Sequence, residues 1–151
     1  MQRIWIYQAN RQLTDAEEAH ILGQLQGFTS QWRAHGKQLA ATAEVRHHRF
    51  IILMVDDAVA PPTGCSIDKS VHLLKEVEQA TGLDLFDRMQ IAYRERETIQ
   101  VVSRDEFAKR MEAGTVTADT IVFNNLIASY PELADRWEVP VKESWHARVF
   151  L

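Results

Sequence analysis

The chain has few of the features that would place it outside a reducing compartment. Its 151 residues include one cysteine, Cys65, so no disulfide can form within the chain. The longest continuous apolar run, from Phe50 to Val55, is far shorter than the roughly 20 residues that span a bilayer. The first residues, Met1 to Tyr7, also lack the long apolar run of a signal peptide. We therefore expect a cytoplasmic protein with no membrane partner.

Glycine and proline are also scarce, with 6 and 4 residues, and they mark turns rather than a linker. The fractions of hydrophobic (46%) and charged (25%) residues are those of an ordinary globular chain. We expect one domain over residues 1–151. The net charge of −4 works against binding to nucleic acid, and the basic stretch Arg46 to Arg49 is short and leads into an apolar strand.

The first half of the chain predicts alternating strands and helices. A strand is expected at Arg3–Ala9, followed by a helix that Thr14 and Glu17 begin with a capping box and that Gly36 ends. A second strand is expected from about Glu44 to Val55, and its apolar second half is typical of a central strand. A second helix is expected at Ser66–Ala80, with Gly82 as its stop.

The second half predicts shorter elements. The expected strand pair is Met89–Tyr93 and Thr98–Val102, joined by Arg94–Glu97. A third helix, capped by Ser103 with Glu106, ends at Gly114. The remaining expectations are a short strand at Thr120–Phe123, a short helix that Ser129 caps and that runs to Trp137, and an irregular or extended tail at Val139–Leu151. This order favours an α/β or α+β fold with a single mixed sheet and helices packed on it.

The most distinctive stretch runs from Thr63 to Ser70, between the central strand and the second helix. Unpaired backbone N–H groups at a helix start carry partial positive charge, so this position suits an anion or a thiolate. The candidate ligand-binding residues are Gly64, Cys65, Ser66, Lys69 and Ser70, and Cys65 is also the candidate catalytic residue. The alternative is structural: Ser66 caps the helix, Gly64 makes the turn and Cys65 fills a small buried space.

This stretch is not a phosphate-binding P-loop. Aligning that motif on Lys69-Ser70 requires glycine at positions 63 and 68, where the chain has Thr63 and Asp68. A carboxylate in place of the second glycine repels phosphate and blocks the close approach of the backbone. The apolar strand that ends in Asp56-Asp57 comes before the loop, which is the wrong order for such an enzyme.

Five segments spread over essentially the whole chain carry a resemblance to known proteins: Ile6–Arg11, Arg49–Asp57, Gly64–Ser70, Phe86–Met89 and Ser144–His146. Together they resemble a family of small uncharacterised bacterial proteins, some of which carry the label "ABC transporter ATPase". The label implies ATP hydrolysis, which the residues above do not support. The resemblance implies no catalytic residues.

The six histidines predict no metal site and no cofactor. Adjacent residues on a strand point to opposite faces, so His47 and His48 are poorly placed to bind one ion together. His72 has Glu76 four residues later, which a solvated helix face explains. Asp56-Asp57 is typical of a turn.

Three functions stay open at this point. The first is a binding or regulatory module that takes a small anionic ligand at Gly64–Ser70. The second is an interaction protein that forms a homo-oligomer, for which a large exposed apolar patch would be the mark. The third is a thiol-dependent enzyme in which Lys69 or a histidine activates Cys65.

Overall fold

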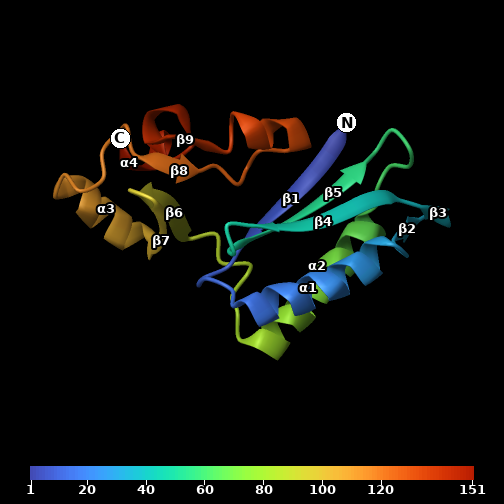
Figure 1. Cartoon of the computed structure of the whole chain (residues 1–151). Helices are drawn as coiled ribbons and strands as arrows, with labels where there is room; N and C mark the ends of the chain where they lie inside the picture. Colours follow the sequence, from blue (N-terminus) through green and yellow to red (C-terminus); the bar gives the residue numbers. More distant parts are fainter. The chain divides into compact units, whose positions relative to one another are not determined.

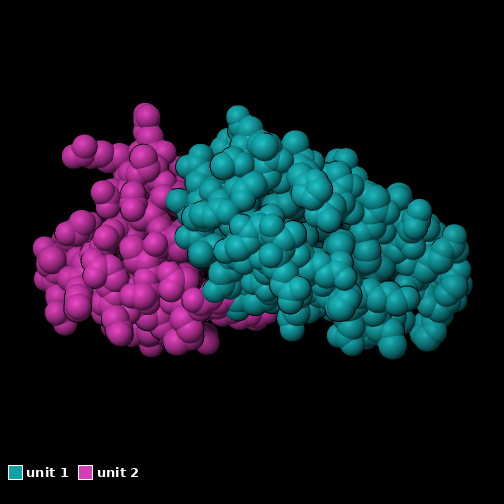
Figure 2. Space-filling model, turned by 90° about the horizontal axis from the view of Figure 1, so that it is seen from below, with its two compact units in different colours: residues 1–86, 128–130 teal, residues 87–127, 131–151 magenta.

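The computed structural model describes all 151 residues and has an α+β fold with three separate sheets, of three, two and four strands. The prediction of a single sheet is therefore wrong. The chain divides into two compact units, residues 1–86 with 128–130 and residues 87–127 with 131–151 (Figure 2). Each unit has its own sheet, and the expectation of one domain over residues 1–151 stays a prediction. None of the helices combines the length and the apolar character that crossing a membrane requires.

The sheet of the first unit consists of β1 (Gln2–Gln8), β4 (Ala40–Arg46) and β5 (Phe50–Asp56), in the order β1-β5-β4. Both pairings are antiparallel. Strand β5 is central, as its continuous apolar run predicts, and its side chains from both faces are buried. Strands β1 and β4 run parallel to each other on either side of β5, which is the arrangement of a split β-α-β motif.

The predicted strand Glu44–Val55 is in fact two strands. The chain reverses in a short turn at residues 47–49, where His47 and His48 have φ of 55° and 54°. Residues with positive φ are usually glycine or asparagine, so this turn carries no ordinary signal in the sequence. The reversal gives β5 a second partner and makes β4 an edge strand of the sheet.

Helices α1 (Asp15–Thr29) and α2 (Gly64–Thr81) both lie on the same face of this sheet (Figure 1). The capping box of Thr14 and Glu17 begins α1 as predicted, but the helix ends at Ser30. Gly36 lies instead in the turn between two short strands, β2 (Arg33–Ala34) and β3 (Lys37–Gln38). Helix α2 begins two residues before the predicted Ser66, and Gly82 ends it as predicted.

The core of the first unit forms where the two helices meet this face of the sheet. Its buried members come from β1, α1, β5, α2 and the connecting loops: Tyr7, Ala9, Leu13, Ile21, Leu25, Ile51, Leu53, Leu74, Val77, Leu83 and Leu85. A smaller cluster, centred on Trp32 with Leu39 and Val55, packs beside it. Residues 128–130 also belong to this unit, because the Ile4 N–H donates to the carbonyl of Ala128 at 3.0 Å.

The second unit contains a four-stranded antiparallel sheet in the order β7-β6-β8-β9. The strands are β6 (Gln90–Glu95), β7 (Thr98–Ser103), β8 (Ile121–Phe123) and β9 (Glu138–Pro140). The predicted β6–β7 hairpin, the short strand β8 and the Ser103-capped helix α3 (Arg104–Glu112) are all confirmed. Phe107 of α3 packs against Tyr93 of β6 in a core of its own.

The end of the chain is more ordered than predicted. The segment expected to be a short helix running to Trp137 is a 3-10 helix, η1 (Tyr130–Ala134), and Ser129 forms a β-bridge with Arg3. The expected irregular tail contains β9, a 3-10 turn η2 (Val141–Glu143) and the short helix α4 (Ala147–Phe150). The carbonyl of Thr120 accepts from the N–H of Val141 at 2.9 Å, which ties the tail to the start of β8.

Candidate ligand-binding site at the start of helix α2

The predicted site residues divide into an exposed set and a buried set. Gly64, Cys65 and Lys69 are exposed at the start of α2, whereas Ser66 and Ser70 are only 1% and 3% exposed. The alternative in which Cys65 fills a small buried space is therefore wrong. The two serines cannot reach a ligand from where they lie, so the exposed set defines the candidate site.

The buried serine hydroxyls are used within the helix itself. Thr63 is the N-cap residue, and its Oγ1 accepts from the N–H of Ser66 at 3.2 Å. In return, the Ser66 Oγ accepts from the N–H of Thr63 at 2.7 Å, which completes a capping box. The Ser70 hydroxyl donates to the carbonyl of Ile67 at 2.6 Å. This cap leaves the N–H groups of Gly64 and Cys65 as the unpaired donors of the first turn.

A buried tryptophan holds this helix start in place. The Trp32 Nε1 donates to the carbonyl of Ser66 at 2.8 Å, and the Trp32 side chain is only 2% exposed. Its ring packs between Trp5 and Phe28, with centroids at 6.2 and 5.0 Å. The sequence places Trp32 in the core but does not identify its partner in α2. The contact ties the first turn of α2 to the buried cluster around Trp32.

The charges around this helix start favour an anion. The first turn of α2 contains no acidic residue. Strand β2 lies beside α2, and the exposed Arg33 and Lys37 belong to the β2–β3 hairpin. Lys69 lies one turn after Cys65 on the same face of the helix. The first turn itself therefore carries no carboxylate that would neutralise its partial positive charge, and the exposed Asp68 follows directly after it.

An open groove of about 500 Å³ follows the same face of α2. Phe28 and Leu73 supply its apolar walls, and the remaining lining residues are charged or polar: Asp68, Lys69, His72 and Glu76. Cys65, Lys69, His72 and Glu76 are spaced by four, three and four residues, so they share one side of the helix. A ligand whose anionic end lies at the first turn can therefore extend along this groove.

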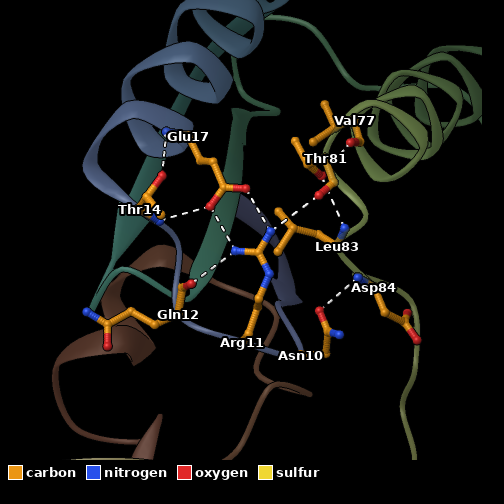
Figure 3. Close-up of polar contacts among 9 residues, drawn as sticks. All are labelled: Asn10, Arg11, Gln12, Thr14, Glu17, Val77, Thr81, Leu83 and Asp84. Carbon is orange, nitrogen blue, oxygen red and sulfur yellow. Dashed lines mark hydrogen bonds and ion pairs between the residues drawn. The ribbon is translucent and has the colours of Figure 1, made fainter.

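The start of helix α1 is built differently, because its polar groups satisfy one another (Figure 3). Arg11 makes two contacts with the carboxylate of Glu17, at 2.8 and 2.7 Å, and also donates to the carbonyl of Thr81 at 3.3 Å. The Arg11 guanidinium and then the N–H of Thr14 lower the pKa of Glu17 to about 2. This cluster places carboxylates at the helix start and connects the β1–α1 loop to the end of α2.

A buried serine–histidine pair lies in the second unit. Ser144 Oγ and His146 Nδ1 are 2.7 Å apart, and the two residues are 8% and 1% exposed. Burial, with the positive charge of Arg104, lowers the pKa of His146 to about 4, so the imidazole is neutral at physiological pH. The pair has the composition of a nucleophile and its base, but both groups are enclosed by protein. We assign it to the packing of the tail.

The second unit also has a cavity of about 430 Å³ with a mainly acidic lining. It is lined by Asn124, Leu126, Ile127, Glu132, Asp135, Arg136, Val139 and Glu143. Asn124 and Leu126 are tied to each other, because the Asn124 Oδ1 accepts from the N–H of Leu126 at 3.1 Å. Three carboxylates against one guanidinium do not suit an anion, so this cavity is not a second copy of the α2 site.

Outside these places, one group of side chains has the composition of a metal site. Asp15, Glu18 and His48 each offer a ligand atom, and the three atoms lie within 4.8 Å of one another. The first two residues belong to α1 and the third to the β4–β5 turn.

No family model, curated protein or solved structure matches this chain.

Proposed function

We propose that this protein is a binding module that holds the anionic group of a small ligand at the start of helix α2. The observation that carries the proposal is that the first turn of α2 is exposed and capped without a carboxylate. The N–H groups of Gly64 and Cys65 then provide two donors at the positive end of an 18-residue helix. The charge of Lys69 supports the same kind of ligand.

The groove along α2 supports a ligand larger than an inorganic ion. Phe28 and Leu73 offer apolar contact, whereas His72 and Glu76 offer polar groups. A small organic molecule with a phosphate or carboxylate at one end matches this order of surfaces. The net charge of −4 works against a nucleic-acid polymer as the natural ligand.

Proline at position 64 gives a direct test. Gly64 is the first residue of α2, where proline is well tolerated, and a Cβ there meets no atom within 4 Å. Gly64→Pro therefore removes one N–H donor and leaves the helix intact. Losing one hydrogen bond to a charged group weakens binding by roughly 10- to 100-fold. Isothermal titration with phosphate, nucleoside monophosphates and small dicarboxylates measures this loss.

Gly64→Ala is the matched control, because it adds a side-chain carbon and keeps the N–H group. It should bind with unchanged affinity. Equal affinities for the proline and alanine variants would contradict the proposed role of the amide. A wild-type protein that binds no member of the panel would contradict a small anionic ligand altogether.

The exposure of Cys65 favours one other function, a thiol-dependent enzyme. A helix start stabilises a thiolate by the same partial charge that attracts an anion. Cys65→Ser distinguishes the two functions, since it removes the thiol and keeps the N–H group. If the wild type turns over a substrate and this variant binds it without turnover, the result supports the enzyme. If the variant binds the ligand and neither protein turns it over, the result supports the binding module. The rate of Cys65 alkylation as a function of pH measures the thiolate directly.

A further inference from the structure

The group formed by Asp15, Glu18 and His48 lies at the opposite end of the first unit from the α2 site. His48 comes shortly before β5 begins at Phe50, and α2 follows the other end of that strand. A strand of this length spans roughly 20 Å, so one small ligand cannot touch both places. The group is therefore independent of the proposed function.

Two elements bring these three side chains together. Asp15 and Glu18 are three residues apart on α1, so their carboxylates project from the same face of its first turn. The turn that carries His48 is held against the loop before α1: the N–H of Leu13 donates to the carbonyl of His48 at 2.7 Å. The N–H of Ala9 donates to the carbonyl of Arg49 at 2.8 Å, which fixes the other side of the turn.

The distances suit a metal ion. Three atoms within 4.8 Å of one another have a common centre no more than about 2.8 Å from each, and Zn–N and Zn–O bonds are about 2.0–2.2 Å long. Small side-chain rotations are enough to close that difference. His48 Nδ1 and Glu18 Oε2 are already 2.6 Å apart, so two of the three ligand atoms lie together without a metal ion.

The charges also favour a cation. The carboxylate of Asp15 is exposed, and it lies beside a second carboxylate on the same turn. The helix start contributes about half a positive charge, which the two carboxylates exceed. A divalent cation bound between them would neutralise two like charges that otherwise repel each other.

We propose that Asp15, Glu18 and His48 form a binding site for a divalent transition-metal ion such as Zn²⁺. One imidazole and two carboxylates are ligands that zinc accepts, and the imidazole favours it over Mg²⁺ and Ca²⁺, which prefer oxygen ligands. Three protein ligands leave at least one coordination position for water. His48 is 52% exposed at the side chain, so the ion would be reached from solvent.

The chain contains a matched control for this site. His72 and Glu76 on α2 also form a histidine–glutamate pair, at 3.2 Å, but no third ligand group joins them. A chelating site depends on the third ligand, so His72→Asn should leave metal binding unchanged. Cys65→Ser is the background for every variant, because an exposed thiol binds zinc by itself.

The test is a titration of the Cys65→Ser protein with Zn²⁺ in competition with a chromophoric chelator, with Mg²⁺ as the comparison ion. We expect one equivalent of Zn²⁺ to bind, and Asp15→Asn or His48→Asn to weaken it at least about tenfold. Asparagine tolerates the positive φ of position 48, so that variant should fold. With Co²⁺ in place of Zn²⁺, the visible absorption should change in both variants.

Three results would overturn the proposal. The first is the absence of stoichiometric binding below millimolar Zn²⁺. The second is an unchanged affinity in Asp15→Asn, which would reduce the group to a simple pair between Glu18 and His48. The third is an equal loss in His72→Asn. Gly64→Pro should bind Zn²⁺ normally, so failure of the metal site and failure of the anion site are separate results.

Discussion

The two helices of the first unit begin with the same local motif and differ in the number of carboxylates in their first turns. Each has a threonine N-cap, Thr14 or Thr63, and a reciprocal capping box. In α1 the box is completed by Glu17, and the first turn carries three carboxylates. In α2 it is completed by the hydroxyl of Ser66, and the first turn carries none. One helix start is therefore surrounded by carboxylates, and the other is capped by neutral groups.

The two helix starts are also anchored by different forces. Arg11 secures the start of α1 through exposed ion-pair contacts with Glu17 (Figure 3). Trp32 secures the start of α2 through a buried hydrogen bond and a buried ring. Surface ion pairs weaken in salt, whereas buried packing does not. The helix start without carboxylates is therefore the one anchored by a buried contact.

The largest effect is expected from removing that support. Trp32→Ala should lower the free energy of unfolding by about 3–5 kcal/mol, because it leaves a cavity and breaks the bond to Ser66. Trp32→Phe keeps most of the packing and should cost about 1–2 kcal/mol. Urea denaturation in low and high salt measures both losses. They should not change with salt, and a loss that salt removes would contradict the buried anchor.

Arg11→Ala is the companion variant for α1. Its loss of stability should be smaller and should diminish as the salt concentration rises. A loss as large as that of Trp32→Ala would show that the two starts are not anchored differently.

The sequence was sufficient to predict one of these helix starts. Thr14 followed by Glu17 is the ordinary signature of a capping box, and α1 begins there. The capping box of Thr63 and Ser66 was missed because the residue three positions after the N-cap is usually glutamate or glutamine and here is serine. The Ser66 hydroxyl is nevertheless close enough to accept from the N–H of Thr63. Ser66 was therefore predicted as the cap and as a ligand residue, although it is buried.

The division into several sheets was not predictable, for a physical reason. A strand's side-chain pattern reports which faces are buried, and it does not report which strand is its partner. Residues 44–49 contain no glycine, proline, asparagine or aspartate to mark a turn, and only the backbone conformation of His47 and His48 shows that the chain reverses there. The position of Cys65 and Lys69 at the start of α2 was predicted because it depends on local sequence alone, whereas the exposure of Cys65 was left open.

A carboxylate placed at the start of α2 should make the two helix starts alike. Cys65→Asp introduces an acidic residue in the first turn, as in α1. It should weaken binding of an anion at least about tenfold and raise the free energy of unfolding by roughly 0.3–1 kcal/mol through the helix dipole. Isothermal titration and urea denaturation measure the two effects. Cys65→Asn is the uncharged control, and equal anion affinities for the two variants would contradict an electrostatic site.

The smallest effect is a difference in the pH dependence of the two helix starts. The pKa of Glu17 is lowered from 4.5 to about 2 in the folded protein, because Arg11 and the N–H of Thr14 stabilise its charged form. Its contribution to stability is therefore complete above pH 4.5 and is lost as the pH falls from 4.5 toward 2. Ser66 has no charge to lose in this range, so the capping box of α2 should stay intact. Amide hydrogen exchange, corrected for the intrinsic rate at each pH, should show the first turn of α1 losing protection as the pH falls from 4.5 toward 2 while the first turn of α2 keeps it. In Glu17→Gln this difference between the helices should disappear, since the variant removes the only titrating member of either box; equal loss of protection in both helices of the wild type would contradict the contrast between a charged and an uncharged cap.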